Sequence, residues 1–460
     1  MDEEKTPEIK TIAELQNEFE KVFLMRDKGV VPLLCATVIA NQMDIDPIWL
    51  LLISPSSGGK TELIESFEQV KLRKGDPMVF PISDLTVNTF ASGQRRDGVE
   101  TSLLHKMKNG AIMTFKDFTS MISKNDDAQK AIMAQLREIY DQNYVKRTGT
   151  GEDIVWQGKV GAIAGCTPII YEANEQFSVM GDRFIMYNMI QPDRMEVLHH
   201  VVNGMKDKTE NFKDKKKHLK KCMKSYLEYC IEEVDNTPLD LSAETEKDLL
   251  EVVNFVTMVA SGVVVDKHKG TITYVPGHTM PMRMAKQILG LAKAFVLMNK
   301  LTPGLSMDTP AMDGRLTPEQ VKILYKVAFD TIPDKRRMAL KVLATFTLGV
   351  STAGLATKIG YQTPVVAGWL AQLNALGICE RDKVSGRTDS WLLRDQFRNI
   401  MVRFDHIKTV NESLDDADEK AEYVASWGGE SSREYEVSSL GQDDYEITDE
   451  EAKINDIFNA

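Results

Sequence analysis

The order of apolar and polar residues divides the chain into blocks with different periods. Ile12, Leu15 and Phe19 recur at helical spacing, and residues 8–46 are expected to form two helices, of which the second is the more apolar. From residue 78 onwards, short apolar runs alternate with helical patterns. Such runs, bounded by turn residues, are typical of buried strands.

This alternation predicts the architecture of the first half of the chain. The expected strands are 78–81, 111–115 and 160–165, and the expected helices between them are 103–108 and 127–140. Strands that alternate with helices of this length form parallel sheets whose two faces are covered. We therefore predict an α/β fold with helices on both faces of a parallel sheet.

The pattern changes twice further along the chain. From about residue 195 to 330 it is mostly helical and includes a lysine-rich run, 213–224, which predicts a solvated helix face or a contact with nucleic acid. After that come three helical segments and two short strands, which together predict a winged helix-turn-helix. The helices are expected at 336–348, 353–359 and 364–376, and the strands around 378–380 and 390–393.

Charge is distributed unevenly. From Glu412 to Ala460 there are 16 acidic and three basic residues, a net charge of −13, against −12 for the whole chain. The rest of the chain is therefore close to neutral, and its charge does not exclude a nucleic-acid partner. The acidic tail is expected to be disordered. Near its end, Ile454, Ile457 and Phe458 share a helical face that could bind a replication partner, and a solubilising tail is the alternative.

Cysteine use and hydropathy exclude several classes of protein. The five cysteines show no CxxC spacing, so neither a disulfide framework nor a zinc site is predicted. No apolar run approaches the roughly 18 residues of a membrane span, and the N-terminus does not resemble a signal peptide. We expect a cytoplasmic protein without a membrane partner.

One loop carries the clearest chemical signal. The apolar run 50–53 breaks at Ser54 and leads to Gly58-Gly59-Lys60-Thr61, which opens a helical pattern. The order matches GxxxxGK(S/T), except that Ser54 replaces the first Gly. In such loops backbone N–H groups surround phosphates, the Lys reaches the β/γ-phosphates and the hydroxyl binds Mg²⁺. The expected cofactors are ATP and Mg²⁺, and the expected contacts are Ser54, Gly58, Gly59, Lys60 and Thr61.

An ATPase also needs an acid at the end of a neighbouring strand. The strand 111–115 is followed by Lys116 and Asp117, and Asp117 is the candidate for catalysis and metal binding. Most such enzymes carry two acids here, whereas Lys116 stands where the metal-facing acid is expected. Capping of the next helix is the alternative role for Asp117.

Four further residues are candidates. A basic, Gly-rich hairpin after the helix 127–140 places Lys146 and Arg147 where they could contact a phosphodiester backbone, with a solvated hairpin as the alternative. The next strand ends near Thr167, whose hydroxyl is expected near the γ-phosphate or as a helix cap. Arg183 precedes another apolar strand, and an Arg in such a place can neutralise charge on a neighbouring subunit's nucleotide.

This order of pieces resembles the AAA+ ATPases that carry a hairpin before sensor 1, above all the minichromosome maintenance (MCM) helicases and their relatives in phages and mobile elements. Residues 281–294 are similar to the lid helix of that family. The resemblance covers roughly residues 45–395 at the level of architecture. It implies that Asp117 is the acid, Thr167 sensor 1, Arg183 a finger that acts in trans, and Arg283 sensor 2.

The resemblance also sets the expected domains. They are N-terminal helices (1–45), an AAA+ core (46–195), a helical lid with sensor 2 (196–330), a winged helix-turn-helix (331–408) and a disordered acidic tail (409–460). Ser54 and Lys116 depart from the family pattern, and the family's separate N-terminal DNA-binding module is expected to be missing. The winged helix would present Arg387 to DNA on its wing, or dock on a protein.

Together these features predict an ATP-dependent DNA motor. The resemblance implies a hexameric ring that binds single-stranded or duplex DNA, as a replicative helicase or initiator of a phage or mobile element. Lys116 favours an alternative, an ATP-gated loader, scaffold or regulatory protein with little hydrolysis. A further alternative is an AAA+ transcription regulator, although residues 85–110 show no obvious polymerase-contacting insertion.

Overall fold

The structure is a computed structural model of the whole chain. It describes residues 7–91, 95–96, 99–100, 102–122, 124–147, 153–171, 183–206, 212–266, 270–304, 313–382 and 390–404. The chain divides into two compact units, Met1–Asp416 and Ala417–Ala460. The acidic tail expected at 409–460 lies outside the described residues.

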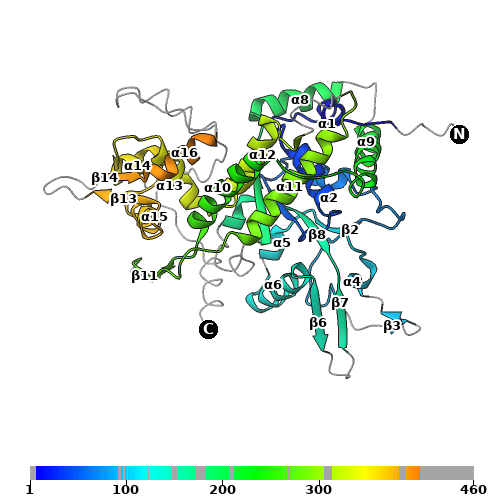
Figure 1. Ribbon diagram of the computed structural model, residues 1–460, viewed down its shortest axis with the longest axis horizontal. Helices are drawn as coiled ribbons and strands as arrows, with labels where there is room; N and C mark the ends of the chain where they lie inside the picture. The colour runs from blue at the N-terminus through cyan, green and yellow to red at the C-terminus, as the bar shows by residue number, and fades with distance from the viewer. Residues whose placement is uncertain are drawn as a thin grey trace, which may run out of the picture. The chain divides into compact units, whose positions relative to one another are not determined.

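A five-stranded parallel sheet forms the core of the first unit (Figure 1). Its strands, in order across the sheet, are β2 (Val79–Pro81), β5 (Ala111–Phe115), β8 (Val160–Cys166), β1 (Trp49–Ile53) and β9 (Phe184–Asn188). The predicted α/β sheet is confirmed. Because all five strands run in the same direction, the carboxyl ends of β5, β8 and β1 lie side by side.

The two faces of the sheet belong to different apolar clusters. Leu50 and Leu52 of β1 pack in the cluster that includes α2 (Val30–Ala40), whereas Trp49 and Leu51 pack in the cluster that includes α6 (Asp126–Tyr140). Successive side chains of a strand point to opposite faces, so a strand that is apolar throughout needs cover on both. Every residue of β1 and of α2 is buried.

The remaining elements before residue 331 surround these layers. Figure 1 shows the hairpin of β6 and β7 extending beyond α6 and away from the sheet. The elements are α1 (Ile12–Glu20), α3 (Lys60–Ser66), β3 (Arg95–Arg96), β4 (Val99–Glu100), α4 (Leu103–Lys106), α5 (Thr119–Ile122), β6 (Asn143–Arg147), β7 (Asp153–Gln157), the short helix η1 (Pro168–Tyr171), α8 (Arg194–Lys206), α9 (Phe212–Glu232), α10 (Ala243–Ala260), β10 (Val264–Val265), β11 (Ile272–Tyr274), α11 (Met282–Lys300) and α12 (Pro318–Asp330).

A group of three helices and a small antiparallel sheet follows α12. Its helices and two of its strands, β13 and β14, lie close to the predicted ranges, and a third strand, β12, joins them in the order β12-β14-β13. Two residues are too few to show a period, so the sequence did not predict β12. The elements are α13 (Asp334–Ala344), β12 (Val350–Ser351), α14 (Thr352–Ile359), α15 (Thr363–Ala375), β13 (Cys379–Asp382), β14 (Ser390–Leu393) and the additional helix α16 (Asp395–Arg403). Arg387 lies outside the described residues.

Among the described helices, none combines the length and the apolar character that crossing a bilayer requires.

Candidate nucleotide site

The loop after β1 depends on its two glycines. A Cβ on Gly58 would lie 2.4 Å from Ser54 Oγ and 2.9 Å from Gln191 Oε1, so a side chain there would collide. Gly59 has φ +81° and comes directly before α3. That conformation favours glycine. Local geometry therefore explains both glycines of the motif.

Lys60 is folded back into this loop. Its Nζ donates hydrogen bonds to Ser54 O (2.6 Å), Ser54 Oγ (2.9 Å) and Pro55 O (2.8 Å). Burial lowers the pKa of Lys60, while Cys166 and Asp117 act in the opposite direction. A desolvated cation among neutral oxygens would gain from an anionic partner such as phosphate. Thr61, the next residue, is exposed.

Asp117 stands at the carboxyl end of β5. Its Oδ1 accepts a hydrogen bond from Thr119 N (2.9 Å), at the start of α5. The capping contact considered from the sequence is therefore present. The side chain is exposed at the same edge of the sheet as the Lys60 loop, and its charge acts on Lys60.

Lys116 pairs with the helix that follows the loop. Its Nζ lies 2.6 Å from Glu65 Oε1 of α3 and 3.4 Å from Oε1 of Glu68, which follows the end of α3. Lys220 of α9 also pairs with Glu68, at 3.0 Å. The Lys116 ammonium thus pairs with carboxylates at the C-terminal end of α3 and just after it. This part of the lysine-rich run is a packed helix surface that pairs with α3, which differs from the expected solvated face.

Thr167 follows β8 and lies next to the turn that holds Asp117. Its amide donates to Thr119 Oγ1 (3.2 Å), and the two hydroxyl oxygens are 3.3 Å apart. Thr119 Oγ1 also lies 3.5 Å from the sulfur of Cys166, whose pKa burial raises to about 11. The ends of β1, β5 and β8 thus bring Lys60, Asp117 and Thr167 to one edge of the sheet.

Arg183 and Arg283 lie together elsewhere. Each guanidinium carbon is 5.6 Å from the centre of the Tyr140 ring, at the end of α6. Arg183 also pairs with Asp141, at 2.6 Å. Gln287 of α11 donates to Tyr140 Oη (3.1 Å) and to the Arg183 carbonyl (2.8 Å). Because Arg183 comes just before β9, this cluster lies at the amino end of the sheet, opposite the Lys60 loop.

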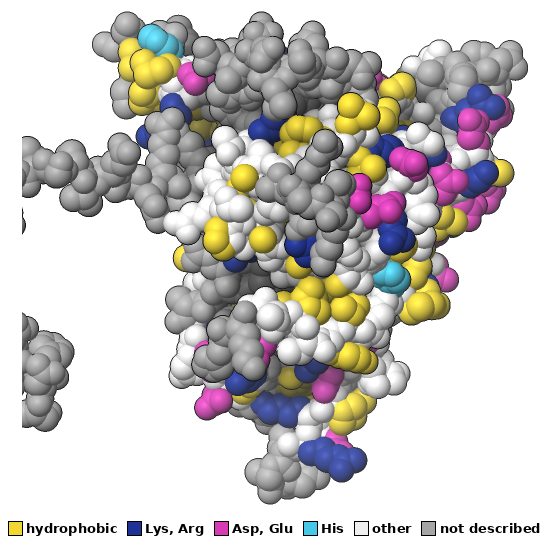
Figure 2. Space-filling view, turned by 90° about the vertical axis from the view of Figure 1, so that its left-hand side faces the viewer, with side chains coloured by type: hydrophobic (Ala, Val, Ile, Leu, Met, Phe, Trp, Pro, Cys, Tyr) yellow, Lys and Arg dark blue, Asp and Glu magenta, His cyan; other side chains and the backbone are white. Residues whose placement is uncertain are grey.

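The two predicted DNA contacts on the hairpin have different surroundings. Lys146 donates to Asn88 Oδ1 (3.1 Å) and to the Ala91 carbonyl (2.9 Å). The Arg147 side chain is 86% exposed, with Asp153 Oδ2 at 4.0 Å. Figure 2 shows Lys and Arg side chains gathered at the lower end of the face, at the height of this hairpin in Figure 1.

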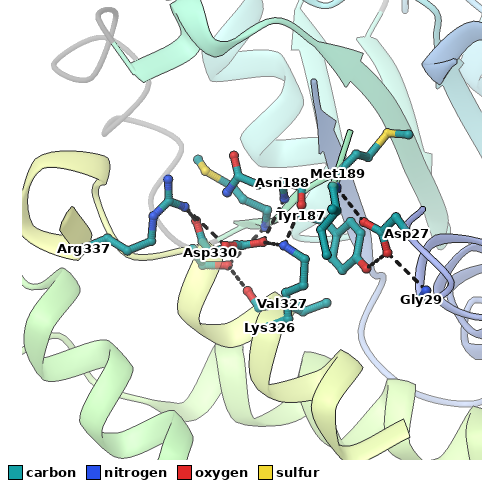
Figure 3. A network of polar contacts seen from close by, with 12 residues as sticks. Asp27, Gly29, Tyr187, Asn188, Met189, Lys326, Val327, Asp330 and Arg337 are labelled. Carbon is teal, nitrogen blue, oxygen red and sulfur yellow. Dashed lines mark hydrogen bonds and ion pairs between the residues drawn. The ribbon is translucent and has the colours of Figure 1, made fainter. Parts of the chain in front are cut away.

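The outer edge of the sheet is closed by a buried polar network (Figure 3). Asp330 of α12 accepts from the Asn188 amide of β9 (2.8 Å) and pairs with Lys326 (2.6 Å) and Arg337 (3.4 Å). On the other side of β9, Asp27 accepts from Tyr187 Oη (2.6 Å). The Asp330 contact satisfies a backbone amide of an edge strand that would otherwise be open to another strand.

Sequence reasoning missed Thr119 and Tyr140. Thr119 directly follows the turn started by Asp117, and its hydroxyl links that turn to Thr167. Tyr140 ends the amphipathic helix α6 and contacts both predicted arginines. Spacing gives no signal for either role, because each arises from strands and helices that are distant along the chain.

Comparison with solved structures gives a distant likeness. No protein-family model matches the chain, and no curated protein matches its sequence. A solved structure described as "SCCmec type IV Cch - active helicase" is similar over 86% of this chain and 73% of that chain, with 10% sequence identity and a TM-score of 0.37. At this level of similarity the comparison assigns neither a family nor an activity.

Proposed function

We propose that the protein is an ATP-dependent DNA motor that hydrolyses ATP at the Lys60 loop, as the resemblance to MCM-like AAA+ ATPases implies. The observation that carries the proposal is the convergence of Lys60, Asp117 and Thr167 at the carboxyl ends of three adjacent parallel strands. Ligands of open parallel sheets bind outside this edge.

The residues present fit ATP and Mg²⁺. Lys60 is desolvated among neutral oxygens, and the exposed Thr61 hydroxyl and Asp117 carboxylate are the oxygen donors that Mg²⁺ prefers. Mg²⁺ would neutralise charge on the phosphates. Lys60 would exchange its bonds with Ser54 and Pro55 for phosphate oxygens, Asp117 would orient the attacking water, and Thr167 would donate to the γ-phosphate.

Arg183 and Arg283 support a site shared between subunits. The strand β9 separates Arg183 from the carboxyl edge by five residues, about 16 Å of extended chain. Since both arginines contact Tyr140 at the amino end, they would act together on a neighbour's nucleotide. Contacts of this head-to-tail kind form rings when the rotation between subunits closes. We propose a hexamer, as in the family that the sequence resembles.

The DNA-binding roles follow from the projecting hairpin and the C-terminal group of helices. The exposed Arg147 is available to a phosphate backbone, whereas Lys146 would first have to leave Asn88 and Ala91. The group α13–α15 with its small sheet has the elements of a winged helix, on which Arg387 would lie. A replication partner for the acidic tail and a role in a phage or mobile element remain parts of this proposal.

The test is steady-state ATP hydrolysis with and without single-stranded DNA. Wild-type turnover should rise with DNA. It should disappear in Asp117→Asn, which keeps a similar shape and an oxygen to accept from the Thr119 amide. Lack of any nucleotide binding by the wild type would overturn the proposal.

A nucleotide-gated loader or regulator is the second candidate, and Lys116 favours it. With Lys116 held by Glu65 and Glu68, Asp117 is the single acid that β5 brings to this edge. On this alternative the wild type binds ATP and assembles on DNA but turns over slowly, and Asp117→Asn changes turnover little. Measuring ATP binding and turnover on the same sample separates the two functions.

A further inference from the structure

A cluster of three different metal-binding side chains lies away from the nucleotide site. Glu18 belongs to α1, and His218 and Cys222 belong to α9, on which α1 packs. Residues four apart share one face of a helix, so His218 and Cys222 both face Glu18. The carboxylate oxygen, the imidazole nitrogen and the sulfur all lie within 4.8 Å of one another.

The distances suit a shared ion. His218 Nε2 lies 3.1 Å from Glu18 Oε2 and 3.3 Å from Cys222 Sγ. Bonds of about 2.0 Å to nitrogen and oxygen and about 2.3 Å to sulfur place the ligands of a tetrahedral zinc ion about 3.3–3.5 Å apart. The two separations from His218 Nε2 are thus within a few tenths of an ångström of those around zinc.

Hydrogen bonding alone fits this arrangement less well. A single imidazole nitrogen carries either a proton or a lone pair. A protonated Nε2 can donate to Glu18, and an unprotonated Nε2 can accept from the Cys222 thiol, but one nitrogen cannot do both at once. A cation at the centre gives all three lone pairs the same partner.

The surroundings prepare the carboxylate for this role. Lys21 donates to the other oxygen of Glu18, at 2.5 Å. Such partners orient ligating carboxylates in metal sites. Cys222 is buried, whereas the His218 side chain is 50% exposed, which leaves a path for the ion and room for a water as fourth ligand.

We propose that Glu18, His218 and Cys222 bind a zinc ion that joins α1 to α9. The mixed oxygen, nitrogen and sulfur ligands suit zinc, whereas Mg²⁺ and Ca²⁺ prefer oxygen alone. The thiol proton leaves to solvent as the sulfur–zinc bond forms. Lys216 of the same helix pairs with Glu62 of α3, and Lys220 pairs with Glu68 just after α3. The ion therefore strengthens the layer that supports the phosphate loop.

The test uses full-length protein stripped of metal with a chelator, without nucleotide and with Mg²⁺ in excess. Zinc is titrated in competition with a chromophoric chelator, and cobalt is used in parallel because a thiolate–cobalt bond gives a near-ultraviolet charge-transfer band. We expect one zinc per chain, the cobalt band, and a thermal midpoint that rises with zinc.

Two pairs of variants decide the outcome. His218→Gln and Cys222→Ser should each weaken zinc binding by at least about tenfold, and Cys222→Ser should remove the cobalt band. The matched controls are His199→Gln on α8 and Cys230→Ser on α9. They should leave the zinc affinity and the cobalt band unchanged. His218→Gln decides the matter if Cys222→Ser fails to fold, because its half-exposed side chain tolerates substitution. Unchanged affinity in His218→Gln, or no saturable zinc binding by the wild type, overturns the proposal.

Discussion

Lys60 is a buried cation whose three acceptors, on Ser54 and Pro55, are uncharged. We expect Lys60→Met to lower affinity for a fluorescent ATP analogue by at least about a hundredfold, since phosphate loses a charge-assisted partner. Methionine has a similar volume and removes a desolvated charge, so the thermal midpoint should stay close to that of the wild type. Retained ATP affinity would exclude Lys60 as the phosphate contact.

Asp330 is the residue on which the buried network of Figure 3 depends. Asp330→Asn leaves Lys326 and Arg337 without their shared carboxylate, and we expect it to lower the free energy of unfolding by about 3–5 kcal/mol at neutral pH. Asp334→Asn is the matched control, because Asp334 contacts Arg337 from a more exposed position and should cost less. Urea denaturation measures both, and equal losses would contradict the central role of Asp330.

The same carboxylate predicts a pH dependence. Burial alone would raise the pKa of Asp330, but Lys326, Arg337 and Lys341 outweigh burial and hold it below the usual 3.8. A carboxyl group with a lowered pKa stabilises the fold above its ordinary value and loses this effect as pH falls through its folded value. The stability difference between wild type and Asp330→Asn should therefore be full at neutral pH and shrink below about pH 4. A difference that stays constant to low pH would contradict this assignment.

At the scale of elements, Arg147 and Lys146 of the β6–β7 hairpin are expected to have different roles, one in DNA binding and the other in stability. Arg147 is exposed, so Arg147→Ala should weaken DNA-stimulated turnover and reduce the salt dependence of DNA binding by about one counterion, with basal turnover unchanged. Lys146→Ala should also disturb the segment around Asn88 and Ala91, and so lower stability. Lys28→Ala removes an exposed charge before α2 and serves as the control. Equal DNA responses in Arg147→Ala and Lys28→Ala would remove the hairpin from the DNA path.

At the scale of the whole molecule, a shared site predicts complementation. Arg183→Ala and Lys60→Met should each be inactive alone. In an equal mixture, about a quarter of randomly formed head-to-tail interfaces would combine an intact loop with an intact arginine, so ATP hydrolysis should partly recover. Asp141→Asn is the control, since it removes the partner of Arg183 within the subunit but keeps the arginine. No recovery at any ratio would remove the main support for a shared site.

Much of the fold was determined by local sequence. The apolar runs of β1, β5 and β8 and the apolar stripe of α6 can be recognised from neighbouring residues alone, without knowing what these elements pack against. Their ranges were therefore predicted to within a residue or two. The tight turn at Gly58 and Gly59 was also predicted locally, because such a turn restricts which residue types can occupy it.

Tertiary structure decided which side chains from distant segments contact one another. Periodicity says which face of a strand or helix is apolar but gives no partner, so the pairing of Lys116 with Glu65, the meeting of Arg183 and Arg283 at Tyr140, and the approach of Glu18 to His218 were not predictable. Each joins segments that are far apart in the chain. The sequence by itself determined the strand, the loop and the lysine of the candidate nucleotide site, and only the packing of the helices decided which charges surround them.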